Sequence, residues 1–475
     1  MVDLSSARVL VVGLGVTGQA VLRALGPVAR TVLTLDARAE DADLADTADV
    51  DLDVIDLVVA SPGWPPSTPL FVEALARGIP VWSEVELAWH LRVPAAATGE
   101  PAPWLAVTGT NGKTTTVEML ASILEADGRR TAAVGNVGRP LVDAVLDEKI
   151  DVLAIELSSF QLHFTHSMSA LAAAVLNIAQ DHLDWHGSLE EYARAKGTVY
   201  ERAQRACIYN TADARTEALV READVVEGAR AVGLTLGAPG RSELGVVEGV
   251  LCDRAFHAAT DDPTRHERAA ELGTLDDLAH LAGPDGSVPS HVVSNALAAA
   301  SLARAYGVGA TAVRDGLRAF RPGGHRIETV ATAAAVAFVD DSKATNAHAA
   351  AASLGSFAPG TVVWIAGGLA KGATFDELVR SRADRLRAAV LIGADHAGLR
   401  EALARHAPDV PVVEVDPGDT GSVMNRAVDQ AFGLAQRGDT VLLAPACASM
   451  DQFSSYAERG DAFAREARRI ASATR

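Results

Sequence analysis

The stretch Val107-Thr108-Gly109-Thr110-Asn111-Gly112-Lys113-Thr114-Thr115 decides how the chain is interpreted. It joins the apolar run 104–108, which has the length of a buried strand, to a helical pattern that begins after Lys113. At such a junction the exposed backbone N–H groups and the helix dipole attract a phosphate. The stretch therefore predicts a phosphate-binding loop in which Lys113 contacts the β- and γ-phosphates and the Thr114 hydroxyl binds Mg²⁺.

This loop is a shortened variant of the P-loop, because the strict spacing has a glycine where Val107 stands. An ordinary glycine-rich turn before a helix is the alternative. Gly-Lys-Thr between a strand and a helix favours a nucleotide site. The predicted nucleotide contacts are Gly109, Thr110, Asn111, Gly112, Lys113, Thr114 and Thr115.

Short apolar runs alternate with helical patterns on both sides of the loop. Such runs occur at 9–12, 31–35, 57–60, 79–82, 152–155, 173–176, 336–339, 362–366, 389–392 and 441–443. The alternation predicts an α/β protein with parallel sheets and crossover helices. The Pro- and Ala-rich segment 94–103 and the turn 321–324 predict three domains, at 1–95, 96–322 and 323–475. We expect a Rossmann-like first domain, a P-loop ATPase-like central domain and a Rossmann-like third domain.

Composition limits the class of protein. Of 475 residues, 49% are hydrophobic and 22% are charged, as in ordinary globular domains. The net charge of -19 and the lack of a long Lys/Arg run argue against a nucleic-acid partner. Three scattered cysteines predict neither a disulfide framework nor a zinc site, and they fit a reducing cytoplasm. The apolar runs are too short for a membrane span, and no signal peptide is expected.

A second glycine pattern follows the first strand. Gly13-Leu14-Gly15-Val16-Thr17-Gly18 fits the dinucleotide fingerprint, and Asp36 ends the next strand, where a ribose-binding acid is expected. Alone, the pattern would indicate NAD, and a purely structural turn is the alternative. Because the turn requires only a pyrophosphate-sized anion, a UDP group fits it as well as NAD does.

Other polar residues follow the strands of the central domain. Glu156 follows the strand 152–155, where a carboxylate can hold Mg²⁺ beside the phosphate loop or simply cap the next helix. The segment 177–187 gathers His182, Asp184 and His186, which indicates either structural histidines or a second metal site. Lys196 lies in a helical pattern and, by itself, is typical of a solvated lysine.

Three strand ends in the last domain carry polar residues. Gly323-Gly324-His325-Arg326 precedes the strand that ends in 340–346 (DDSKATN). Lys371 follows Gly367-Gly368, and the segment 445–459 follows a later strand. The carboxyl ends of parallel strands are where a doubly wound sheet binds its ligand. Their agreement predicts one ligand-binding crevice.

Together these motifs resemble the Mur ligase family over essentially the whole chain. The shared marks are TGTNGKTT (108–115), Glu156, the segment around His182, Lys196, and Asn295 in SNALAA (294–299). GLGVTG (13–18), SPG (61–63), ELSSFQL (156–162), DDSKATN (340–346) and PACASMDQF (445–453) resemble the motifs of the member that adds D-glutamate.

The resemblance implies an ATP-dependent ligase of peptidoglycan precursor synthesis. Such an enzyme joins D-glutamate to the L-alanine carboxylate of UDP-N-acetylmuramoyl-L-alanine through an acyl phosphate, releasing ADP and phosphate. It implies UDP binding in domain 1–95, ATP binding in 96–322 and amino-acid binding in 323–475. The expected protein is a cytoplasmic monomer whose partners are these small molecules.

The same resemblance assigns individual residues. The implied catalytic residues are Lys113, Glu156, His182 and Lys196, and two Mg²⁺ ions would be held by Thr114, Glu156, His182 and a CO₂-derived carbamate on Lys196. Asn295, Arg326 and Asp341 would complete the nucleotide site. The implied substrate residues are Gly15, Thr17, Asp36, Arg38, Asn136, Ser158, Ser159, Lys343, Thr345, Lys371, Ser449 and Tyr456.

The chain departs from the family pattern at three positions, which are Ala37, Val292 and Leu369. These positions concern contacts to uracil, adenine and D-glutamate. Alternative functions are a sister ligase such as a folylpolyglutamate-type enzyme, an NAD-dependent oxidoreductase, and a non-catalytic ATP-binding regulator. The intact Lys113, Glu156 and Lys196 argue against the last of these.

Overall fold

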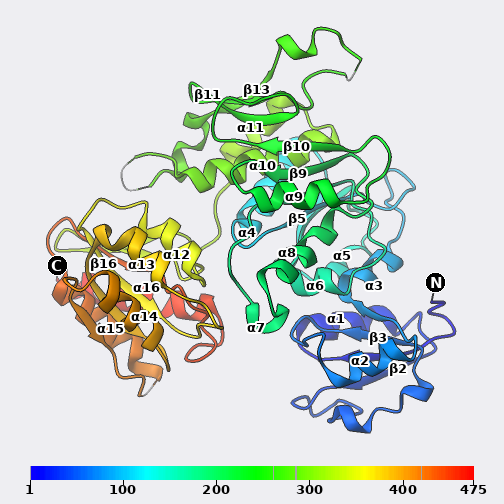
Figure 1. Cartoon of the computed structure of the whole chain (residues 1–475), viewed down its shortest axis with the longest axis horizontal. Helices are drawn as coiled ribbons and strands as arrows, with labels where there is room; N and C mark the ends of the chain where they lie inside the picture. The colour runs from blue at the N-terminus through cyan, green and yellow to red at the C-terminus, as the bar shows by residue number, and fades with distance from the viewer. Residues whose placement is uncertain (1, 260, 284–285, 419, 475) are drawn as a thin grey trace. The chain divides into compact units, whose positions relative to one another are not determined.

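The protein is seen in a computed structural model that describes residues 2–259, 261–283, 286–418 and 420–474, with the side chains of Asp184 and Thr420 outside the description. The described residues form three β-sheets with flanking helices (Figure 1). They group into two compact units. Unit 1 comprises 1–178, 185–278 and 292–320, and unit 2 comprises 179–184, 279–291 and 321–475. The predicted α/β class is confirmed, and the three-domain boundaries remain a prediction.

The first sheet of unit 1 has four parallel strands in the order β2-β1-β3-β4. Its strands are β1 (Arg8–Val12), β2 (Thr31–Leu35), β3 (Leu57–Ala60) and β4 (Val81–Ser83). Its helices are α1 (Val16–Leu25), η1 (Thr47–Asp49), η2 (Leu52–Val54), α2 (Pro69–Ala76) and α3 (Glu84–Leu91). Apolar residues fill β1 and β3, and both central strands are almost wholly buried. This is why their sequences lack polar alternation.

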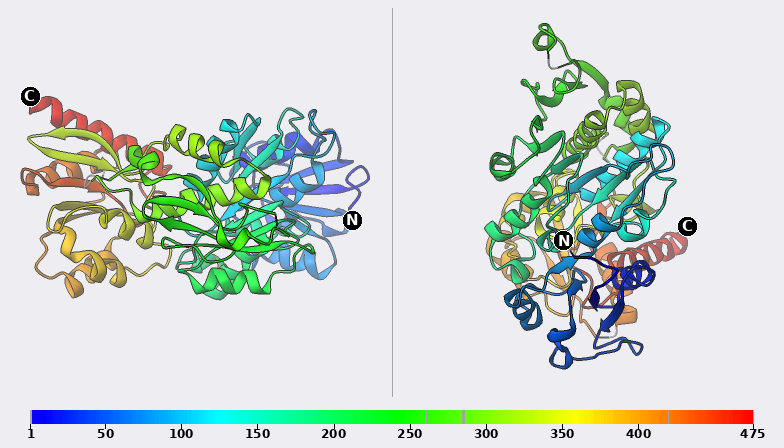
Figure 2. Two further views of the ribbon diagram at one scale, coloured as in Figure 1. Left: turned by 90° about the horizontal axis from the view of Figure 1, so that it is seen from above. Right: turned by 90° about the vertical axis from the view of Figure 1, so that its right-hand side faces the viewer.

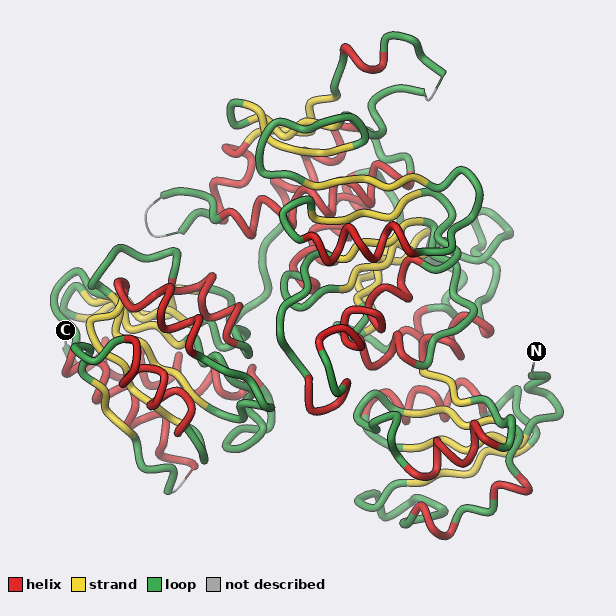
Figure 3. The backbone as a smooth tube through the Cα atoms, in the orientation of Figure 1, coloured by secondary structure: helices red, strands yellow, loops and turns green. Residues whose placement is uncertain are grey.

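The second sheet has nine strands in the order β13-β12-β11-β10-β9-β8-β5-β7-β6. Its strands are β5 (Trp104–Thr108), β6 (Thr131–Gly135), β7 (Val152–Glu156), β8 (Ala172–Val175), β9 (Ala206–Asn210), β10 (Arg230–Leu234), β11 (Glu243–Val247), β12 (Val250–Asp253) and β13 (Ala270–Thr274). Strands β5 to β11 run parallel, and β12 and β13 continue the sheet antiparallel. The loop-rich stretch after β12 stands out in Figure 3.

Helices connect these strands. They are α4 (Lys113–Ala126), α5 (Leu141–Ala144), α6 (Ser159–His163), α7 (Leu183–His186), α8 (Leu189–Gly197), η3 (Thr198–Tyr200), α9 (Ala214–Glu222), η4 (Arg265–Glu267), η5 (Leu275–Leu281), α10 (Ser290–Tyr306) and α11 (Ala310–Ala319). The close packing of α11 on α4 depends on Gly316, since a Cβ there would lie 2.4 Å from the Ile123 Cα. The helix α4, which starts at the phosphate loop, is thereby fixed.

The third sheet, in unit 2, has six strands in the order β14-β15-β19-β16-β17-β18. Its strands are β14 (Glu328–Ala333), β15 (Val336–Asp340), β16 (Val362–Gly367), β17 (Leu386–Ile392), β18 (Val412–Glu414) and β19 (Thr440–Leu443), and only β14 runs antiparallel to its neighbour among these described strands. Its helices are α12 (Ala347–Leu354), α13 (Asp376–Arg382), η6 (Ala383–Arg385), α14 (Ala397–His406), α15 (Thr420–Leu434) and α16 (Tyr456–Ala473). The long α16 lies beside the β14–β15 hairpin (Figure 2).

Two buried glutamates join the first two sheets within unit 1. Glu84, at the start of α3, accepts a hydrogen bond from the Val142 N–H at 3.3 Å. Glu86 accepts from the N–H groups of His166 and Ser167, at 2.7 and 2.9 Å. Burial raises the pKa of Glu84. Removing Glu84 would leave the buried Val142 N–H without this acceptor, and removing Glu86 would do the same to two part-buried N–H groups, so the junction is specific.

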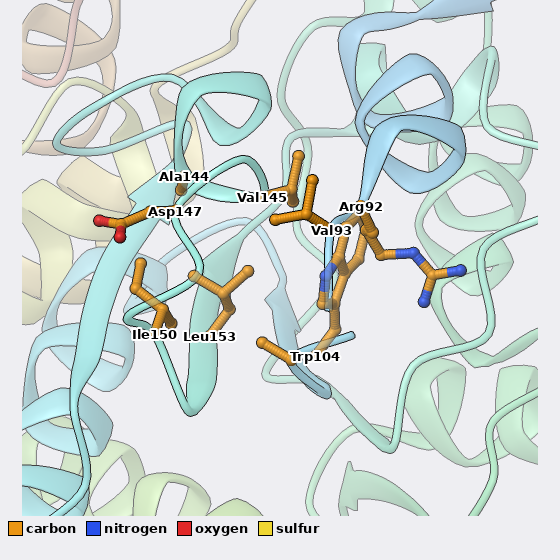
Figure 4. A pocket seen from close by; sticks show the side chains of 9 residues that line it. Arg92, Val93, Trp104, Ala144, Val145, Asp147, Ile150 and Leu153 are labelled. Carbon is orange, nitrogen blue, oxygen red and sulfur yellow. The ribbon is translucent and has the colours of Figure 1, made fainter. Parts of the chain in front are cut away.

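A pocket also lies at this junction (Figure 4). The pocket is open to solvent, its empty space together with that solvent is about 220 Å³, and it is lined largely by apolar side chains with Arg92 and Trp104. The Arg92 guanidinium lies 3.1 Å from the centre of the Trp89 ring. Burial lowers the pKa of Arg92 to about 10. The pocket lies by the amino end of β5, whereas the phosphate loop follows the carboxyl end. It is therefore separate from the candidate site.

Candidate active site

The phosphate loop has the backbone that its glycines predict. Gly109 has φ 146° and Gly112 has φ 84°, conformations that favour glycine. A Cβ on Gly112 would lie only 2.4 Å from the Oδ1 atom of Asn295. The structure thus brings Asn295, a predicted nucleotide residue on α10, against the loop.

The residue that fixes the loop most directly is Asn177, just after β8. Its Oδ1 accepts from the Asn111 N–H at 2.9 Å, and its Nδ2 donates to the Asn111 carbonyl at 3.1 Å. Its carbonyl accepts from the Thr110 N–H at 2.9 Å. Asn177 therefore holds both the N–H and the carbonyl of one loop residue. It lies in the motif 177–187 but was not among the predicted site residues.

Lys113 and Thr114 begin α4 at the loop. The Lys113 ammonium donates to the carbonyls of Gly109 and Thr110, at 2.9 and 2.8 Å. Thr114 is buried, and Thr115 follows it in the first turn. This places the ammonium over the loop, where a phosphate-binding lysine is expected.

Glu156 is the last residue of β7, beside the loop. Its register partner on β5 is Val107, so its side chain lies one strand away from the start of the loop. Its Oε1 accepts from the Nδ2 of Asn136 at 2.8 Å. Its Oε2 is buried and has no hydrogen-bond partner among the described residues. A buried carboxylate oxygen without a donor is costly unless a cation binds it.

Lys196 is also buried at this edge of the sheet. Its Nζ lies 3.4 Å from the Thr108 Oγ1 and 4.6 Å from the centre of the Tyr192 ring. Tyr192 in turn donates from its hydroxyl to the Thr110 Oγ1 at 3.1 Å. Helix α8 thereby attaches to the start of the phosphate loop. Lys196 is thus no solvated lysine, which the helical pattern alone could not reveal.

Ser158 and Ser159 start α6, directly after Glu156. Ser158 forms a capping box with Gln161, whose Oε1 accepts from the Ser158 N–H at 2.9 Å. Ser159 is buried, and its Oγ lies 2.9 Å from the Nε2 of His186. Ser158 and Ser159, which are both predicted substrate residues, are therefore held by their own helix and by α7.

His182 belongs to unit 2, with Asp181. Its Nε2 lies 3.6 Å from the Asp181 Oδ1, and Asp181 Oδ2 accepts from the Asn346 Nδ2 at 3.3 Å. His182 has φ 53°, which is uncommon for a residue other than glycine. The Asp184 side chain lies outside the described residues. The structure thus places His182 with the second unit, while Glu156, Lys113 and Lys196 lie in the first.

The glycine turn of the first sheet is closed by Ser61 and Asp36. The Ser61 hydroxyl donates to the Gly13 carbonyl at 2.8 Å. The Asp36 carboxylate accepts from the Leu14 N–H at 2.7 Å and from the Arg38 N–H at 2.8 Å. The bond from Leu14, then that from Arg38, lowers the pKa of Asp36. A charged Asp36 thus orders the turn that carries Gly15 and Thr17, while Arg38 lies beside it.

In unit 2 the predicted residues follow β15, β16 and β19. The Lys343 ammonium lies 4.0 Å from the centre of the Tyr456 ring. The Thr345 N–H donates to the Lys343 carbonyl at 2.8 Å. Asp341 is buried, and this burial, with Asp340 beside it, raises its pKa to about 7. Arg326 is among the charges that act on Asp341, in the opposite direction.

Two further loops approach each other in unit 2. Leu369 and Ala448 exchange backbone hydrogen bonds of 2.9 and 3.0 Å, which brings the loop of Lys371 to that of Ser449. Lys371 has φ 51° and Ala446 has φ 61°. Such positive φ values in residues other than glycine gather at ligand sites, where the surrounding structure enforces them. The loops after β16 and β19 thus meet, and the ligand-binding crevice predicted at these strand ends stays a prediction.

Arg459 connects two of these strand ends. It is 1% exposed, and its guanidinium donates to Ser342 Oγ and Ser342 O, each at 3.0 Å, and to the Cys447 carbonyl at 3.1 Å. Burial lowers its pKa to about 10. The sequence placed Arg459 near the site without a role. Its contact with Ser342 spans 117 residues, which no local pattern reveals.

No described helix is both long and apolar enough to cross a membrane. Within the same residues, no three His, Cys, Asp or Glu side chains form a group that could hold a metal ion.

Models of known families match two parts of the chain. The Mur ligase middle domain matches residues 107–241, and the Mur ligase glutamate ligase domain matches residues 325–447. A Streptomyces avermitilis protein named UDP-N-acetylmuramoylalanine–D-glutamate ligase is 57% identical over 98% of this chain and 99% of its own. Relatives of the same name from Thermobifida fusca and Bifidobacterium adolescentis are 51% and 46% identical, over 99% and 98% of this chain and 100% and 98% of theirs.

Solved structures with the same fold are more distant in sequence. A pseudomurein peptide ligase type C from Methanothermus fervidus has a TM-score of 0.56 at 16% identity, covering 99% of this chain and 100% of its own. A MurF ligase from Thermotoga maritima in complex with ADP also has a TM-score of 0.56 at 16% identity, over 100% of both chains. These similarities concern the fold alone.

Proposed function

The chain belongs to the Mur ligase family, and on this premise we propose that it is an ATP-dependent UDP-N-acetylmuramoylalanine–D-glutamate ligase. The observation that carries this function lies at the carboxyl ends of β5 and β7 in the nine-stranded sheet. There the phosphate loop, Glu156 and Lys196 lie together, and the buried Glu156 Oε2 has no hydrogen-bond partner in the part of the chain that the structure describes. Relatives of that name at 46–57% identity support the substrate pair.

The donor set at this edge fits Mg²⁺. Thr114 supplies a hydroxyl and Glu156 a carboxylate oxygen, and hard oxygen ligands are those that Mg²⁺ prefers beside phosphates. Bound Mg²⁺ would neutralise charge on the phosphates of ATP. We place one ion at Thr114 and Glu156, and we assign His182 and the carbamate of Lys196 to a second ion.

The chain's own residues then have these tasks. Lys113 would bind the β- and γ-phosphates, so that the L-alanine carboxylate of the acceptor attacks the γ-phosphate and forms an acyl phosphate and ADP. The amine of D-glutamate would then attack the acyl carbon, and phosphate leaves. Asn136, Ser158 and Ser159 would hold the acceptor near Glu156. No side chain needs to become a covalent nucleophile.

Lys196 supports a carbamate for a physical reason. A lysine that is 2% exposed loses most of its hydration, so burial favours the neutral amine. The neutral amine is the form that adds CO₂. The product would be an anion beside the phosphate loop, where it could bind a cation.

Residues of the other two sheets would bind the remaining substrate parts. Domain 1–95 would hold UDP at the Gly15 turn, and domain 323–475 would hold D-glutamate. The proposed D-glutamate contacts are Lys343, Thr345, Lys371, Ser449 and Tyr456. Asn295, Arg326 and Asp341 would complete the ATP site. Closure near 321–324 would exclude water from the acyl phosphate. Identical small-angle scattering with and without substrates would contradict closure.

The test is ADP release by the purified protein with UDP-N-acetylmuramoyl-L-alanine and ATP. We expect release with D-glutamate and little with L-glutamate or with other amino acids that sister ligases use. Nucleotide consumption that does not depend on acceptor and D-glutamate would overturn the proposal. We further propose that the enzyme is a cytoplasmic monomer, which its sedimentation coefficient tests in part.

A further inference from the structure

The second histidine of the segment 177–187 lies in unit 1, beside the acceptor residues. The Nε2 of His186 is 2.9 Å from the Oγ of Ser159. His186 ends α7, and Ser159 begins α6, so the contact links two short helices through residues that are 27 positions apart. Nothing in the proposed function uses His186.

Aromatic rings fix the plane of the His186 imidazole. The Phe160 ring stacks on it at 15° with centroids 5.7 Å apart. The Trp185 ring lies at 4.4 Å, and the Tyr192 ring lies edge-on at 5.3 Å. With its plane held from several sides, the imidazole cannot turn away from Ser159 without disturbing this cluster.

The position of this contact relates it to the reaction. Ser159 lies three residues after Glu156, and Tyr192 donates to Thr110 of the phosphate loop. His186 therefore lies between the acceptor side and the nucleotide side of the site. A change at its ring nitrogen reaches the acceptor through one hydroxyl group.

A serine hydroxyl has one proton and two lone pairs, so its partner decides what remains for a ligand. If Nε2 carries no proton, the Ser159 O–H donates to it and the oxygen can accept from an amide N–H. If Nε2 carries a proton, it donates to the oxygen, and the O–H is free for a carbonyl. His186 thus sets the hydrogen bond that Ser159 can offer.

We propose that His186 is a positioning residue that orients the Ser159 hydroxyl toward the peptide-like amide between the muramoyl group and L-alanine of the acceptor. The proposal rests on the proposed function, because it assigns Ser159 to that substrate. It deepens the function by naming a determinant of acceptor affinity that acts without contact to ATP or D-glutamate.

The test compares His186→Phe, His186→Gln and the matched control His163→Phe. Phenylalanine at 186 keeps an aromatic ring in the cluster but removes the bond to Ser159, whereas glutamine restores an amide near the position of Nε2. His163 packs edge-on against the same Trp185 ring, at 5.3 Å, and the structure shows it no hydrogen bond to Ser159. Its substitution therefore reports on packing alone.

Acceptor affinity is measured by calorimetry without nucleotide or metal, and KM values are measured by ADP release. We expect His186→Phe to weaken acceptor binding about 5- to 10-fold, the effect of one hydrogen bond. The KM values for ATP and D-glutamate should stay within about twofold. His186→Gln should recover most of the affinity, and His163→Phe should bind like wild type.

Unchanged acceptor binding by His186→Phe would overturn the proposal. So would an equal loss in His163→Phe, because packing would then explain the effect. A failure of the proposed function looks different: the wild-type protein itself would show no release of ADP that depends on D-glutamate.

Discussion

Asn177→Ala should detach the phosphate loop from the end of β8. The change removes two hydrogen bonds to Asn111, of 2.9 and 3.1 Å, and leaves the backbone bond from Thr110 in place. Each lost bond is worth about 0.5–1.5 kcal/mol, so the loop loses about 1–3 kcal/mol of its preference for the observed conformation. If nucleotide binding requires that conformation, affinity falls about 5- to 150-fold.

The assay is calorimetric titration of the protein with ADP and Mg²⁺, together with thermal unfolding. Asn210→Ala is the matched control, because Asn210 ends the neighbouring β9 and also makes two side-chain bonds, to the Leu176 carbonyl and from the Ala212 N–H. Both variants should lose similar unfolding stability. Only Asn177→Ala should lose nucleotide affinity, and wild-type affinity in this variant would refute the role given to Asn177.

Three other predictions concern buried charges. Lys196→Ala should abolish activity, and acetate should restore part of it by replacing the carbamate; activity that persists without acetate contradicts the carbamate. The pKa of Asp341 is raised from 3.8 to about 7, so its favourable protonated form is lost as pH rises through about 7. The melting temperature of Asp341→Asn should therefore rise relative to wild type between pH 5 and 8, and a constant difference would contradict this. Arg459→Ala should lower unfolding stability by about 3 kcal/mol or more, since it leaves Ser342 and Cys447 without their donor, and should raise the KM for D-glutamate. Arg459→Lys should recover part of both, and an unchanged KM in both variants would remove Arg459 from the site.

The backbone of the predicted phosphate loop and its neighbour Glu156 could be predicted from the sequence because their determinants are local. A strand, two glycines and a lysine within ten residues specify the loop, and the end of β7 places Glu156 next to it. Strands β2, β3 and β5 have the predicted bounds, since their apolar runs end at polar or glycine residues. The family resemblance, which rested on these motifs, is confirmed by the full-length relatives.

The residues that hold the site together could not be predicted in the same way. Asn177 bonds to Asn111 across 66 residues, and His186 bonds to Ser159 across 27. Asn177 follows a strand and His186 ends a short helix, and asparagine and histidine are common at such positions, so the sequence does not mark either residue. Their proximity depends on the strand order β8-β5-β7, which apolar runs alone do not specify. No predicted apolar run marks the strands β10 to β13, because these strands are short and only partly buried.

The buried glutamates of α3 bear on which part of the protein can move during the reaction. Glu84 accepts from the Val142 N–H and lies 3.5 Å from the Gln161 Nε2, and Gln161 caps the helix that starts with Ser158 and Ser159. The first sheet is therefore attached directly to the acceptor segment beside Glu156. If the first sheet moved relative to the acceptor segment, these carboxylates would lose their hydrogen bonds or become exposed to water, which is costly in free energy. A UDP group held by the first sheet would then lie at a set distance from Ser158, so the closure proposed above is expected at the boundary near 321–324 and not between these two sheets.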